Sequence, residues 1–211
     1  MFSDMELDAL KEIGNIGAGN AATALSLLLS NKINMNVPRV AIISFDDVSN
    51  SVGGPENLVA GIFMRITGDI SGNILIIIPK PNAYNLVNYL LKHQPGEAGF
   101  SAMEESALVE VGNIIASSYI VALSDFTKLS MKISVPGFAY DMAGAIFSFP
   151  LSLYGYMGDT AFLIETEFTE GIDDINFHFF LIPDDESLKV LLKAIGVSSF
   201  GWNGQSRNGG I

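Results

Sequence analysis

The 211-residue sequence contains no cysteine, only two histidines and a single tryptophan. The lack of cysteine excludes disulfide bonds and thiolate chemistry, and it leads us to expect a cytoplasmic protein. His93 and His178 have no partner at a metal-ligand spacing, so we expect no metal or other cofactor bound by this chain. Because G-x-S-x-G and Walker motifs are also missing, neither a serine-hydrolase elbow nor an NTPase phosphate loop is expected.

Positive charge is scarce as well: the chain has 11 lysines and arginines but 23 acidic residues, for a net charge of −12. A chain with this charge has no cationic surface for phosphates, which argues against nucleic acid and favours a basic protein partner. The longest aliphatic run, residues 74–78, is far shorter than the ~20 residues that span a bilayer. The first six residues include two acidic side chains and no basic one, so we expect neither an export signal nor membrane insertion.

What the sequence does contain is a regular order of predicted elements. Capping boxes of the form S-x-x-E, at Ser3 and Ser101, predict the starts of two long helices over residues 3–30 and 101–129. A helical wheel places one stripe of residues on the packed face of the first helix: Leu10, Ile13, Gly17, Ala21, Ala24 and Leu28.

Strand-like runs follow each long helix. In the first half we expect strands at 38–45, 58–67 and 72–79 and then a short helix at 81–92. In the second half we expect strands at 133–141, 143–150, 160–169 and 175–183 and then a short helix at 184–195, whose first residues are acidic. Residues 198–211 are rich in glycine and polar residues, and we expect a disordered tail there.

One stretch of the first long helix returns in the second. Residues 12–26 and 110–124 match at 8 of 15 positions with a constant offset of 98. We therefore predict one α+β domain over residues 1–197, internally duplicated into halves 1–95 and 96–197. The two long helices should lie side by side against a shared sheet, related by a pseudo-two-fold axis, with the short helices at the periphery.

The repeated stretch contains glycines that could suggest a phosphate-binding loop. Gly14, Gly17 and Gly19 have the spacing G-x-x-G-x-G, no strand precedes them, and they lie within a helical pattern. We favour the interpretation that they allow another part of the backbone to approach closely, at a cost of about 1 kcal/mol each against alanine.

The polar residues of the repeat form a second pattern. Asp8, Glu12 and Asn15 lie within one arc of the helical wheel, directed away from the apolar stripe, and Ser106, Glu110 and Asn113 repeat this arc. An asparagine amide can orient a water molecule, but it does not titrate and cannot act as a general base. The glutamate and asparagine of each copy therefore suit a reaction whose substrate is already activated by other groups, such as hydrolysis of an acyl phosphate. A solvated helix face without function is the simpler alternative.

The spacing extends to a proline in each half, Pro38 and Pro136. The pattern of Asp or Ser, three residues, Glu, two residues, Asn, 22 residues and Pro resembles the signature of the CheC, CheX and FliY phosphatases of bacterial chemotaxis. Both copies are complete. Two sites without an appended flagellar-switch domain resemble the CheC type within that family, and the order of elements agrees over about residues 1–197.

The resemblance implies a chemotaxis phosphatase with two long antiparallel helices on a continuous sheet. Its substrate would be phosphorylated CheY, whose acyl phosphate lies beside a Mg²⁺ ion held by CheY. Glu12 and Glu110 would bind a lysine of CheY, and Asn15 and Asn113 would position the attacking water. The resemblance also implies binding to CheD, so we expect a monomer or a heterodimer with CheD.

Two alternatives remain open at this stage. The chain could be a non-catalytic adaptor that binds CheY or CheD, or a duplicated structural domain whose polar stripe is solvated surface. The copies differ at their first position, Asp8 against Ser106, so equal activity does not follow from the sequence.

Overall fold

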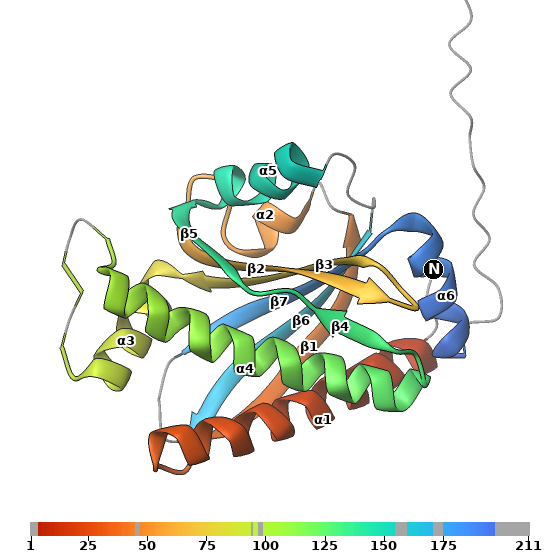
Figure 1. Ribbon diagram of the computed structural model, residues 1–211, viewed down its shortest axis with the longest axis horizontal. Helices are drawn as coiled ribbons and strands as arrows, with labels where there is room; N and C mark the ends of the chain where they lie inside the picture. Colours follow the sequence, from red (N-terminus) through yellow and green to blue (C-terminus); the bar gives the residue numbers. More distant parts are fainter. Residues whose placement is uncertain are drawn as a thin grey trace, which may run out of the picture.

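The computed structural model describes residues 4–44, 47–93, 95–96, 99–154, 160–170 and 175–196. Its helices are α1 (Asp4–Leu29), α2 (Val48–Ser51), α3 (Lys80–Leu91), α4 (Ala102–Thr127), α5 (Ala143–Tyr154) and α6 (Asp185–Ala194). Its strands are β1 (Asn34–Ser44), β2 (Leu58–Gly68), β3 (Gly72–Pro79), β4 (Met131–Ile133), β5 (Gly137–Met142), β6 (Thr160–Glu170) and β7 (Asn176–Pro183). Figure 1 shows the long helices α1 and α4 side by side on one face of the sheet, with α2 and α5 on the other.

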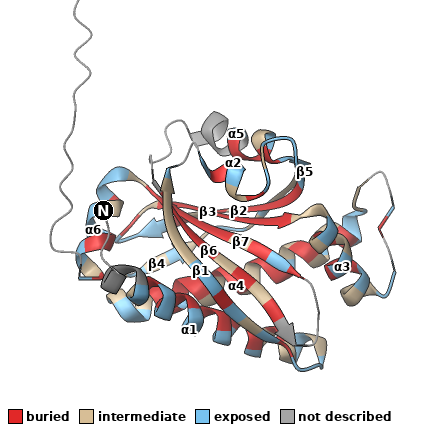
Figure 2. Cartoon of the chain, turned by 180° about the vertical axis from the view of Figure 1, so that it is seen from behind, coloured by how far each residue is buried: buried red, intermediate tan, exposed pale blue. Residues whose placement is uncertain are grey.

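The strands form one antiparallel sheet in the order β1-β6-β7-β3-β2-β4, and β5 also pairs with β2. The central strand β3 is buried along nearly its whole length, because helices cover both faces of the sheet. Strand β7 is also buried from Phe179 to Pro183, as Figure 2 shows for most of the strand. This packing explains the aliphatic run at residues 74–78.

The sheet order reads the same when the two halves of the chain are exchanged. Strands β1, β2 and β3 of the first half take the places of β5, β6 and β7 of the second, and β3 meets β7 at the centre. The register agrees in detail, since Gly61 pairs with Ala139 and Leu163 pairs with Ala41. The predicted α+β class and the two long helices on a continuous sheet are confirmed. The half boundaries at residues 95 and 96 and the domain end at 197 stay predictions.

The buried stripe of α1 was predicted correctly over its first four turns but not at its end. Leu10, Ile13 and Ala21 are buried, whereas Leu28 is 53% exposed and Leu25 takes its place in the core. Leu25 lies one turn after Ala21, and Leu28 belongs to the last turn of the helix. The prediction for Leu28 was therefore wrong.

The predicted strand at residues 143–150 was also wrong, because this segment begins helix α5. Its buried residues Ala143, Ile146 and Phe147 have helical spacing and pack with Val48 and Val52 on the second face of the sheet. The start of the helix is fixed by tertiary hydrogen bonds, in which the Ala143 and Gly144 amides donate to carbonyls of residues 57 and 55. The short helix α2 was not predicted.

The second capping box is confirmed. The Ser101 amide donates to the Glu104 carboxylate over 2.5 Å, and the Ser101 hydroxyl accepts from the Glu104 amide. The backbone hydrogen bond from Ser101 is the largest cause that lowers the pKa of Glu104. The first capping box and the tail at residues 198–211 lie outside the described residues.

Helix α4 is the one helix, in the part of the chain that the structure describes, that is long and apolar enough to cross a membrane. Half of that apolar segment is buried inside the protein, with Leu108, Val111 and Ile115 in the main hydrophobic core. The apolar composition of α4 is therefore explained by its packing on the sheet.

Candidate functional site

The first copy of the polar motif lies on the outer side of α1. Asp8, Glu12 and Asn15 are exposed, while Ile13 and Gly14 between them face the sheet and are buried. Spacings of four and three residues keep the three side chains on one helical face. The amphipathic packing of α1 thus turns the motif outward.

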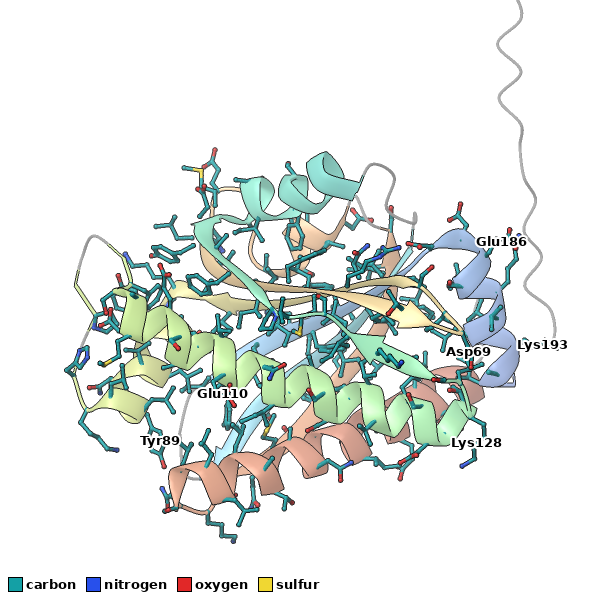
Figure 3. All side chains as sticks on the ribbon, viewed as in Figure 1. Asp69, Tyr89, Glu110, Lys128, Glu186 and Lys193 are labelled. Carbon is teal, nitrogen blue, oxygen red and sulfur yellow. The ribbon has the colours of Figure 1, made fainter. Side chains whose placement is uncertain are left out.

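The second copy has the same placement on α4 (Figure 3, where Glu110 is labelled). Ser106 and Glu110 are exposed and Asn113 is half-buried, while Val111 and Gly112 face the sheet. The structure therefore brings each predicted triplet together on its own helix, and no predicted glutamate or asparagine is buried.

These four side chains are free of local partners. Glu12, Asn15, Glu110 and Asn113 make no side-chain hydrogen bond or ion pair with any residue that the structure describes. Some hydroxyl groups of the long helices, in contrast, bond to the chain; Ser118, for example, donates to the Ile114 carbonyl over 2.8 Å. The glutamates and asparagines can accordingly bind another molecule without first breaking an internal contact.

The motif prolines interrupt equivalent strands. Pro38 lies in β1 at a register shift. Asn36 and Arg39 are three residues apart, but their partners in β6 are only two residues apart. Pro136 lies between β4 and β5. Ile133 and Gly137 are four residues apart, but their partners in β2 are only three residues apart. One extra residue at each place makes a bulge, which accommodates a residue without an amide hydrogen. The single strand expected at residues 133–141 is therefore two strands.

The glycines set how closely the helices approach. A Cβ atom at Gly17 would lie 2.5 Å from the Tyr119 ring and 3.0 Å from the Tyr119 Cα, so only glycine fits between α1 and α4 here. A Cβ at Gly112 would collide with Ile62, whereas one at Gly19 would meet nothing within 4 Å. The close-packing interpretation holds for Gly17 and is wrong for Gly19. A Cβ at Gly14 would make ordinary contact, at 3.4 Å, with the side chains of Val37 and Ile164.

Tyr119 also ties the helix layer to the sheet. Its hydroxyl forms a buried 2.7 Å hydrogen bond with the Thr166 hydroxyl on β6, and burial strongly raises the pKa of Tyr119. Sequence reasoning missed this pair, since nothing in the sequence links residues so far apart.

The contact between Gly17 and Tyr119 also fixes the register of the antiparallel helices. Asn15 lies opposite about residue 121 of α4, eight residues beyond Asn113, or about 12 Å along the helix axis. The two copies therefore occupy separate places on one helix layer.

No metal centre is apparent: within the described ranges, no group of three or more histidine or acidic residues is placed to hold a metal ion. His93 instead lies 3.4 Å from the buried Glu104 carboxylate. His178 stacks on Phe180, and burial lowers the pKa of His178.

The glutamates and asparagines of the motif also lie outside two pockets formed by the described residues. Pockets of about 390 and 370 Å³ are lined by other residues, the first beside the end of α1 and the second at the ends of β6 and β7. Small-molecule sites are usually enclosed, so an open helix face suits a macromolecular substrate better.

Comparison with known proteins finds relatives that match most of the chain. The chain is 37% identical over 202 residues to the CheY-P phosphatase CheC of Bacillus subtilis, covering 93% of this chain and 97% of that protein. The chain belongs to the CheC-like family. The family model matches residues 5–42 and 103–140, two segments that differ by the same offset of 98.

A second relative is the flagellar motor switch phosphatase FliY of B. subtilis, 31% identical over 137 residues, or 64% of this chain and 35% of FliY. Among solved structures, Thermotoga maritima FliY matches with a TM-score of 0.71 and 20% identity, over 92% of this chain and 98% of that one. The FliM middle domain of Helicobacter pylori matches with a TM-score of 0.66 and 12% identity, over 92% and 99%. At these identities the solved structures show the fold alone.

Proposed function

We propose that this protein is a phosphatase that hydrolyses the aspartyl phosphate of CheY-type response regulators at two copies of one site. The observation that carries the proposal is the repeated, outward-facing pair of Glu12 with Asn15 and Glu110 with Asn113. Kinship to a protein known as a CheY-P phosphatase supports the choice of substrate.

In this proposal Asn15 or Asn113 enters the regulator's active site and orients one water molecule toward the phosphorus atom. The water oxygen bonds to phosphorus, the bond to the aspartyl carboxylate breaks, and inorganic phosphate leaves. The carboxylate is a good leaving group, so no general base of tuned pKa is required. A hundredfold acceleration requires the activation free energy to fall by about 2.7 kcal/mol, which orienting the nucleophile can supply.

Glu12 and Glu110 hold the regulator in this proposal. A free carboxylate one helical turn from each asparagine can accept a charge-assisted hydrogen bond from a lysine of the partner. The free, exposed state of both glutamates supports this role. The Mg²⁺ ion beside the acyl phosphate belongs to the regulator, and CheD is proposed as a second partner in the cytoplasm.

The test is the rate of phosphate loss from phosphorylated CheY with Asn15→Ala and Asn113→Ala combined. We expect the accelerated rate to fall by about a hundredfold, to near that of CheY alone. Asn20→Ala is the matched control, because Asn20 is an exposed asparagine of α1 outside the motif. Full activity in the double variant, with a stable fold, would overturn the proposal.

A non-catalytic adaptor is the second candidate, and the exposure of Glu12, Asn15 and Glu110 on open helix faces favours it. An adaptor would bind phosphorylated CheY or CheD without changing the rate of phosphate loss. Pull-down with Glu12→Lys and Glu110→Lys, measured beside the rate assay, separates the two candidates.

A further inference from the structure

Two exposed apolar side chains accompany the first copy of the motif. Ile16 follows Asn15, lies one turn beyond Glu12, and is 44% exposed. Val121 on α4 is 53% exposed, although most apolar residues of that helix are buried. Neither side chain is required by the core of the fold.

The helix register places Val121 beside this copy. Gly17 lies against Tyr119, and Leu10 lines a small cavity together with Ile120 and Leu123, so residues before Gly17 face residues after Tyr119. Tyr119 points inward, and a step of two residues turns Val121 to the outer surface. With packed helix axes about 8–10 Å apart, Val121 and Ile16 border the polar face of Glu12 and Asn15.

The second copy keeps one apolar residue of this pair and has a polar residue in place of the other. The offset of 98 makes Thr23 the counterpart of Val121 and Ile114 the counterpart of Ile16. Thr23 is exposed but polar, and its hydroxyl donates to the Gly19 carbonyl over 2.9 Å. Ile114 is half-buried.

We propose that Val121, with Ile16, forms an apolar docking patch for the response regulator at the first copy, so that the two copies bind the regulator with different affinities. The proposal rests on the proposed function. Its occupant is the same folded phosphoprotein, because the patch is continuous with the polar groups that would engage it. Apolar anchors beside a charged contact are typical of the residues that carry protein–protein affinity.

Binding measurements in backgrounds with a single working copy test this inference. Glu110→Lys with Asn113→Ala removes the second copy, and CheY activated with beryllofluoride and Mg²⁺ serves as the probe. In this background Val121→Thr should raise the Kd by about fourfold, which is the loss of affinity expected when one buried methyl-sized apolar group is removed from the contact. The reciprocal change, Thr23→Val with Glu12→Lys and Asn15→Ala, should lower the Kd of the second copy.

Val135→Thr is the matched control, since it makes the same chemical change at an 88% exposed valine beside Pro136, in the disabled copy. We expect it to leave the Kd of the first copy within about twofold. An unchanged Kd for Val121→Thr, or an equal effect of Val135→Thr, overturns the docking patch. The proposed function fails separately, if the double asparagine variant keeps full phosphatase activity.

Discussion

The two halves of the molecule present the same polar motif on equivalent helices, but the strands beside the motif differ. In the first half Val37 is buried against Gly14 and β1 runs on through its bulge at Pro38. In the second half the counterpart Val135 is 88% exposed, and the strand is split around Pro136. The bulge adds one residue in both halves. The difference teaches that a duplicated fold can keep its register while the burial of single side chains beside the motif changes.

The contacts of the long helices with the sheet are more alike in the two halves. Gly14 lies against Ile164 of β6 and Gly112 against Ile62 of β2, so each long helix packs with a glycine on the equivalent strand of the other half. A change here would disturb two layers at once, whereas the residues around the polar faces are free to differ.

Replacing the asparagines should have the largest effect and tests whether the two copies of the motif are equivalent. Asn15→Ala and Asn113→Ala alone should each remove the activity of their own copy, by about a hundredfold at that copy. If the copies work independently, the residual rates of the two single variants add up to the wild-type rate of phosphate loss. A sum well below the wild-type rate would show that the copies cooperate.

The helix contact gives the next largest effect. We expect Gly17→Ala to lower the free energy of unfolding by about 2 kcal/mol, because its Cβ would collide with Tyr119. Gly19→Ala, two residues away, should raise it by about 1 kcal/mol, since its Cβ has open space and alanine favours the helix. Urea unfolding measures both, and effects of the same sign would contradict the register described for α1 and α4.

The two peripheral helices provide a third difference. Asp184 at the start of α6 accepts hydrogen bonds from Arg65 and Ser71, each as short as 2.7 Å, whereas α3 has no acidic residue in its first turn. Burial acts to raise the pKa of Asp184, but the hydrogen bonds from Arg65 and Ser71 and the Arg65 charge outweigh it and lower the pKa below 3.8.

Because the folded pKa of Asp184 lies below the unfolded one, its stabilisation is complete above about pH 4 and is lost as the pH falls through the folded value. Asp184→Asn should therefore cost about 1 kcal/mol at pH 7, allowing for solvent screening, and less at pH 3. Thermal unfolding across this range measures the effect. Glu186→Gln is the control on the same helix (Figure 3); because the Glu186 side chain is 86% exposed, we expect it to cost less stability than Asp184→Asn at pH 7.

The first motif position gives the smallest effect. Asp8 and Glu12 are like charges one turn apart, so Asp8→Ser should stabilise the fold by about 0.3 kcal/mol and Ser106→Asp should destabilise it by a similar amount. Both differences should shrink at 1 M salt, where screening is strong. Changes that persist at high salt would point to a contact other than charge repulsion.

Much of this architecture could be predicted from the sequence. The spacing of Glu12 and Asn15, repeated at an offset of 98, required both pairs to share an outward helical face once the apolar stripe was buried. The β3 boundaries at Gly72 and Pro79 were predicted as observed, because a continuous apolar run between turn residues has few other solutions.

Only the tertiary structure decided the rest. Residues 143–150 have the composition of a strand, but contacts with residues 55 and 57 begin a helix there. The pairing of Gly17 with Tyr119 and the place of Val121 beside Asn15 depend on the register of two helices about 100 residues apart. The sequence by itself determined which residues share a helical face, since that follows from 3.6 residues per turn. Which face meets which neighbour depends on side-chain shape across the interface, and no local pattern encodes it.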